Sequence, residues 1–157
     1  MKFTLLKDLR RDPLMRPVLT GFLLFLMLFI TSDLAQKREQ IGLHVSSASG
    51  VIYGDEESYI DPISTVSLLE ILHSDLFMVM MTLLTLSAIY IRLSPYEKLT
   101  KILLHAVMLS AILSFILLLM AHYFQSIFLI LWLISLWSWH ILAFCMSVES
   151  LYRLYSS

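Results

Sequence analysis

Four of the five histidines lie in or beside long apolar stretches of the sequence: His73, His105, His122 and His140. An ionisable ring is costly in hydrocarbon, and ionisable residues inside a membrane mark functional sites by default. Imidazole is also a common metal ligand and a haem axial ligand. These four histidines are therefore the strongest candidates for chemistry in the chain.

The composition that surrounds them is that of a membrane protein. The chain has 157 residues, of which 59% are hydrophobic and 15% are charged, whereas soluble domains have about 45–50% and about 25%. The mean hydropathy is +0.82. The sequence predicts an all-α, four-helix bundle forming one membrane domain. Its expected parts are a cytoplasmic or interfacial segment at 1–16, an outer loop at 34–63, and membrane helices at 17–33, 65–92, 95–122 and 126–150.

The basic residues predict how the bundle is oriented. Nine of the eleven lysines and arginines lie on one side of this layout, and only Lys37 and Arg38 lie on the other. The positive-inside rule then places both termini in the cytoplasm and the 34–63 loop outside. We expect a multi-pass protein of a bacterial inner membrane.

The outer loop is the one soluble part of any size. Residues 51–60 have apolar and aromatic flanks around Gly54-Asp55-Glu56, a pattern that predicts a small hairpin. Tyr53 and Tyr59 would be exposed there, and tyrosines are typical of interface cores. We therefore expect membrane or periplasmic protein subunits to bind this loop, with further contacts through the helix faces and the lipid bilayer.

The helix rise sorts the histidines into two layers. Counting about 1.5 Å per residue from each helix centre places His73 and His122 near the outer surface, and His105 and His140 on the inner side. Each layer takes its histidines from two different helices. That is the arrangement needed to hold one b-type haem in each layer, with both irons ligated by facing helices.

In architecture alone, this arrangement is similar to the four-helix cytochrome b anchors of quinone-linked oxidoreductases. The likeness implies an electron-transfer or quinone-interacting membrane subunit that carries b-type haem on the four histidines. Such a chain would be a non-catalytic part of a redox complex, although an enzyme is not excluded.

An alternative is a non-haem metal site at the outer face. Glu70 and His73 form Glu-x-x-His on one helical face, and His122 could complete a mononuclear site with them. Glu70 also fits a helix-start capping box at Ser67, which we favour. A further alternative is an accessory or anchor protein that assembles a larger complex without any cofactor.

Other classes of function find no support in the sequence. It contains no nucleotide-binding glycine loop and no nucleophile motif, and its basic residues follow membrane topology, so no nucleic-acid surface is expected. The single cysteine, Cys145, excludes an intramolecular disulfide.

Overall fold

The computed structural model describes residues 13–156, and this part of the chain folds into five helices. They are α1 (Met15–Gln40), α2 (Val45–Tyr53), α3 (Thr65–Leu93), α4 (Glu97–Tyr123) and α5 (Ile127–Tyr155). Most of the segment predicted at 1–16 lies outside the described residues.

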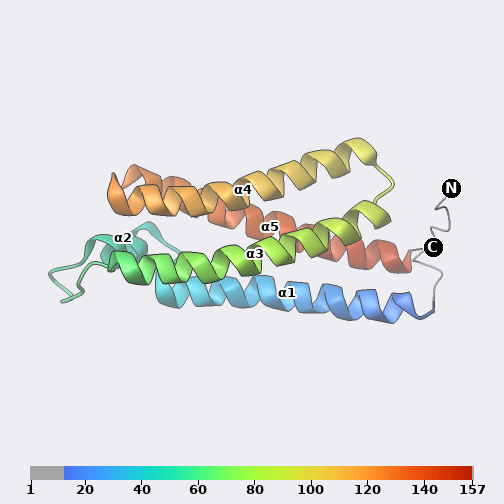
Figure 1. Ribbon diagram of the computed structural model, residues 1–157, viewed down its shortest axis with the longest axis horizontal. Coiled ribbons are helices and arrows are strands. Elements are labelled where there is room, and N and C mark those ends of the chain that lie inside the picture. The colour runs from blue at the N-terminus through green and yellow to red at the C-terminus, as the bar shows by residue number, and fades with distance from the viewer. Residues whose placement is uncertain (1–12, 157) are drawn as a thin grey trace.

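Four of these helices are long and apolar enough to cross a membrane: α1, α3, α4 and α5. They run along the long axis of the molecule, and the short helix α2 packs at one end (Figure 1). We call the end that carries α2 the loop end, and the opposite end, which carries the α3–α4 connection and the C-terminus, the terminal end. The predicted all-α membrane bundle is confirmed at this level.

Helix α1 continues seven residues beyond the predicted end at residue 33. Its buried positions are spaced three and four apart and form one continuous seam: Leu19, Leu23, Leu26, Ile30, Asp33 and Lys37. Because Asp33 and Lys37 are charged, the sequence predicted that the helix ends here and a loop begins. That boundary is wrong, because both side chains face partners inside the bundle.

The connection between α1 and α3 contains a helix where a hairpin was expected. Residues 45–53 form α2, and the predicted hairpin is reduced to one antiparallel bridge between Asp55 and Ile60. The turn before α2 requires Gly42, whose φ is +101° and whose N–H donates to the Lys37 carbonyl over 2.9 Å. A Cβ at Gly42 would lie 2.3 Å from Ser47 Oγ. The Tyr53 hydroxyl donates to the Ala121 carbonyl over 2.8 Å, so α2 is fastened to α4.

The capping of α3 also differs from the expectation. Ser64 is the N-cap, and its hydroxyl oxygen accepts from the Ser67 N–H over 3.1 Å. The predicted box that joins Ser67 to Glu70 is therefore wrong, and Glu70 is exposed one turn farther along the helix.

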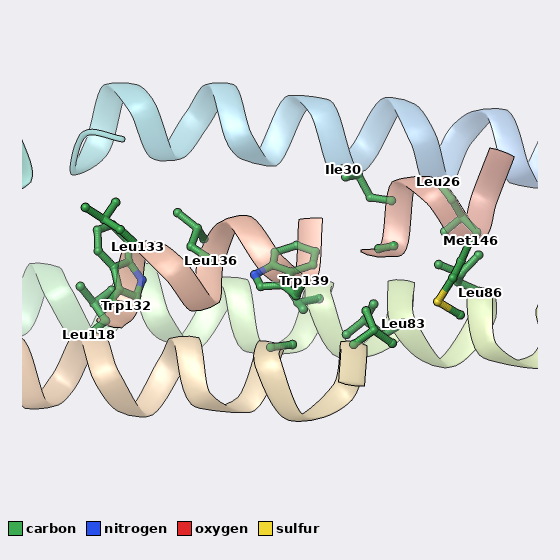
Figure 2. Close-up of a cluster of buried hydrophobic side chains, with 14 of the residues drawn as sticks. Leu26, Ile30, Leu83, Leu86, Leu118, Trp132, Leu133, Leu136, Trp139 and Met146 are labelled. Atoms are coloured by element: carbon green, nitrogen blue, oxygen red, sulfur yellow. The ribbon is translucent and has the colours of Figure 1, made fainter. Parts of the chain in front are cut away.

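Helices α4 and α5 are antiparallel neighbours and pack together more extensively than any other pair. The Ser135 hydroxyl of α5 donates to the Ser110 carbonyl of α4 over 2.7 Å, which is possible only where two helices approach closely. Figure 2 shows Trp132 and Trp139 of α5 buried among leucines of the neighbouring helices. This apolar core surrounds the polar groups described below.

Candidate functional site

Two ion pairs are buried inside the bundle, and both join α1 to another spanning helix. His140 of α5 meets Asp33, and Asp75 of α3 meets Lys37. The exposed fractions of these residues are 3% for His140, 6% for Asp33, 6% for Asp75 and 5% for Lys37. Charged side chains are almost never buried to this extent unless they are paired. These four residues are the candidate site.

The His140 ring is held from both of its nitrogens. Nε2 lies 2.9 Å from Asp33 Oδ2, and Nδ1 lies 2.8 Å from the Leu136 carbonyl oxygen of its own helix. The ring also lies against Trp139, with centroids 3.6 Å apart. His140 is the fourteenth residue of α5, which runs from Ile127 to Tyr155, so the pair lies near the middle of that helix.

The second pair lies one turn closer to the loop end. Lys37 follows Asp33 by four residues on α1, and its Nζ donates to Asp75 Oδ2. With His140 and Lys37 protonated and both carboxyls ionised, the two cations balance the two anions. Such a pairing offsets part of the cost of taking charges out of water.

The outer histidines of the predicted haem layer lie on different levels. Nε2 of His122 is 3.2 Å from the Thr65 hydroxyl at the start of α3, whereas His73 lies eight residues, or roughly 12 Å, farther along that helix. His73 is exposed on an apolar groove between α3 and α4, lined also by Leu76 and Phe115.

The inner histidines share a level but face different ways. The bond between Ser135 and Ser110 places His140 opposite His105 in the antiparallel α4–α5 pair. His105 is exposed, and its Nδ1 donates to the Lys101 carbonyl over 2.6 Å. His140 instead faces Asp33 of α1. The structure therefore brings neither predicted histidine pair together around one point.

The residues of the alternative metal site are likewise apart. Within residues 13–156, no group of three or more His, Cys, Asp or Glu side chains is arranged to hold a metal ion. Glu70 and His73 lie on the exposed face of α3, while His122 contacts the first residue of that helix.

A second polar cluster lies at the terminal end. The Tyr90 hydroxyl donates to Glu149 Oε2 over 2.5 Å, and Arg153 donates to the other oxygen of that carboxylate. Arg153 also donates to the Ser94 hydroxyl over 3.3 Å and lies over the Tyr96 ring. These contacts join α5 to the end of α3 and to the α3–α4 connection.

Comparison with known proteins gives a family but no described relative. Residues 42–157 match a family described as a transmembrane helical domain (Aq_1264_TM). The chain belongs to this family. No curated protein and no solved structure matches the chain. Together with the four apolar helices, the family match shows that this is an integral membrane protein.

The transmembrane helical domain shared with the family contains only half of the candidate site. Asp75 and His140 lie within the matched residues, whereas Asp33 and Lys37 precede them. The buried pairs therefore join the matched domain to α1.

Sequence reasoning found His140 but missed its partner and the Lys37–Asp75 pair. A signal for them was present, because Asp33 and Lys37 continue the spacing of Leu23, Leu26 and Ile30 on α1. Two charged residues in register with an apolar seam indicate buried partners on a neighbouring helix.

Proposed function

We propose that this protein is a membrane subunit of a larger complex and that Asp33 and His140 form a proton-exchange site within it. The observation that carries the proposal is the position of the His140 ring, held between a carboxylate and a carbonyl inside the bundle. Chains of carboxylates and histidines at this depth are typical of proton relays in membranes.

The hydrogen-bond chemistry limits where protons can reside. The Leu136 carbonyl only accepts, so His140 Nδ1 carries a proton. A second proton lies between Nε2 and Asp33 Oδ2, giving either an imidazolium beside a carboxylate or a neutral imidazole beside a carboxylic acid. Moving this proton requires no movement of heavy atoms. Loss of the second proton would leave a lone pair facing a carboxylate, so the pair is poised to take a proton up again.

The neighbouring ion pair lies beside this site. Asp75 and Lys37 lie one turn away from Asp33 and His140, and the Lys37 cation is paired with the Asp75 carboxylate, so this pair is neutral as a whole when both groups are charged. The groups that face the exchanging proton are thus Asp33 and Lys37 of α1, Asp75 of α3 and His140 of α5.

Infrared spectroscopy of the protein in lipid nanodiscs, recorded during a pH titration, tests the proposal. We expect a carboxylic-acid C=O band that grows on acidification and is missing in the Asp33→Asn variant. The His140→Gln variant should move the band, because the partner that shares the proton is replaced. The Ser138→Ala variant is the matched control, since Ser138 is half-buried on the same helix and bonds only to the Ile134 carbonyl among the described residues. A titration identical in the parent and in Asp33→Asn would sink the proposal.

Two exposed groups support the assignment to a larger complex. Tyr59 is 95% exposed in the acidic loop, and the exposed ring of His73 lies six residues, or roughly 9 Å, from the middle of α3. A polar ring facing lipid at that depth is costly unless a partner covers it. Purification from native membranes should therefore yield an assembly that the double variant Tyr59→Ala/His73→Leu fails to hold, and a monodisperse monomer would contradict this part of the proposal.

The redox function remains a second candidate, favoured by one observation at His122. Its Nδ1 is buried and has no hydrogen-bond partner among residues 13–156. Such a nitrogen is free to ligate b-type haem or a transition metal, or to bind a quinone. A visible absorption spectrum with haem bands that are weakened in His122→Ala would support this candidate, and metal analysis of the same two samples would distinguish a non-haem ion.

A further inference from the structure

Helix α1 ends well short of the other spanning helices at the loop end. Two contacts fix its register against α5: Asp33 meets His140, and the Thr20 hydroxyl lies 2.9 Å from that of Tyr155. By this register Gln40, the last residue of α1, lies six to eight residues, or roughly 10 Å, inside the start of α5. Figure 1 shows α1 stopping before the ends of α3 and α4, with α2 beside the gap.

A cavity of about 510 Å³ lies where α1 stops. It is lined by Arg38, Gly42, Leu43, His44, Ser47 and Trp137. Trp137 lies ten residues along α5 and about one turn from His140. The cavity therefore extends from the loop end toward the level of the buried pairs.

Half of the residues that line this cavity have charged or polar side chains. Arg38 is charged, and His44 and Ser47 are polar and exposed. Irregular backbone such as residues 41–44 is tolerated at membrane depth only where it lies against protein or lines a water-filled cavity. Nearby, Gln40 Oε1 is buried without a hydrogen-bond partner in the described part of the chain. A water molecule at this position would donate a hydrogen bond to that oxygen.

On the side of His140 toward the terminal end, closely packed apolar side chains are accompanied by the buried serines Ser87, Ser147 and Ser150. Figure 2 shows Leu26, Leu83, Leu86 and Met146 packed together between α1, α3 and α5 on the side toward the terminal end. All four are buried. These side chains are closely packed, whereas the side toward the loop end has the cavity.

We propose that this cavity is a hydrated vestibule that gives the Asp33–His140 pair access to protons from the loop end. The vestibule is inferred from the fold, and only its role in proton supply rests on the proton-exchange function. In the supply step, a hydronium ion in the vestibule gives one proton to the deprotonated pair. The O–H bond of the hydronium breaks, a proton bridge forms between Nε2 and Oδ2, and one water molecule remains.

Cysteine accessibility tests the vestibule without any measurement of protonation. In a Cys145→Ala background, single variants Trp137→Cys, Leu131→Cys and Met146→Cys are placed in nanodiscs, where a water-soluble methanethiosulfonate reaches both faces. Leu131 lies closer than Trp137 to the loop end and is exposed to a similar extent, 42% against 39%, but it does not line the cavity. Depth alone would make Leu131→Cys the more reactive variant, so the comparison isolates the vestibule.

We expect Trp137→Cys to react about tenfold faster than Leu131→Cys, because only a thiol in contact with water ionises and attacks the reagent. Met146→Cys should remain unreactive, since Met146 is buried among closely packed side chains. Should Trp137→Cys fold poorly, His44→Cys provides a second position on the wall of the cavity. Slower labelling of Trp137→Cys than of Leu131→Cys, or rapid labelling of Met146→Cys, would overturn the proposal.

The outcome separates this inference from the proton-exchange function. Labelling of Trp137→Cys with no titrating band from Asp33 would leave the vestibule and remove its role in proton supply. A titrating band with unreactive Trp137→Cys would leave the exchange site and remove the vestibule.

Discussion

His140 and Asp33 are 107 residues apart in the chain, yet Nε2 of one lies 2.9 Å from Oδ2 of the other in the interior of the bundle. This contact fastens the first spanning helix to the last. Both side chains are more than nine-tenths buried. The stability of the bundle and the proposed proton exchange would therefore depend on the same two side chains.

Removing one partner of this pair should destabilise the bundle strongly. In Asp33→Ala the His140 ring stays buried without its carboxylate, and loss of one member of a buried pair costs about 3 kcal/mol or more. Asp33→Asn retains a hydrogen-bonding side chain and should cost less. Unfolding by a denaturing detergent in mixed micelles, followed by tryptophan fluorescence, measures both, with Ser138→Ala as the control.

The double variant Asp33→Ala/His140→Leu shows whether the two residues act as a unit. Its loss of stability should be smaller than the sum of the single losses, because no unpaired polar group remains. Strict additivity would mean that the contact contributes nothing of its own.

Replacing one member of the Lys37–Asp75 pair should also destabilise the bundle more than replacing both members. Lys37→Met alone leaves the Asp75 carboxylate buried without a cation and should lower stability. Lys37→Met/Asp75→Leu replaces the whole pair with apolar groups of similar volume and should recover most of that loss. The same micelle titration measures both, and a double variant no more stable than Lys37→Met would contradict the expectation.

At the terminal end, Tyr90→Phe should have a modest effect. It removes one of the two groups that hold the Glu149 carboxylate, while Arg153 remains. Interhelical hydrogen bonds in membranes are worth about 0.6 kcal/mol on average, so the loss should be of that order. Tyr152→Phe, on the exposed side of the same end, should change nothing. Equal losses in the two variants would show that the Tyr90 bond does not stabilise the bundle.

The loop should respond to acid through Asp55. A hydrogen bond from Ser58, assisted by backbone N–H groups, holds the pKa of Asp55 below its ordinary value of 3.8. A depressed folded pKa stabilises the folded loop above the unfolded pKa, and this stabilisation is lost as pH falls through the folded value. Ser58→Ala should raise the pKa of Asp55, as measured by carbon NMR of its carboxyl group. Ser46→Ala, in the adjacent helix α2, should leave it unchanged, and an unmoved pKa in Ser58→Ala would contradict the assigned cause.

The sequence by itself determined the membrane class and the number of spanning helices. Apolar runs long enough to cross a bilayer are a local property, because each helix must satisfy its own backbone hydrogen bonds in lipid. For the connection between α1 and α3, the sequence predicted a hairpin where the structure has a helix. Residues 45–53 are helical because Gly42 turns the chain and Tyr53 anchors to Ala121, and neither contact is visible in a local pattern.

The partners of the polar residues were decided only by the tertiary structure. The sequence marked His140 as an intramembrane ring, but depth along a helix does not specify which neighbour the ring faces. The sequence predicted a loop at Asp33 and Lys37 because charged side chains are costly in lipid. Helix packing offsets this cost, because it brings His140 opposite Asp33 and Asp75 opposite Lys37. The identity of the buried site therefore follows from the helix register, which α1, α3 and α5 establish together.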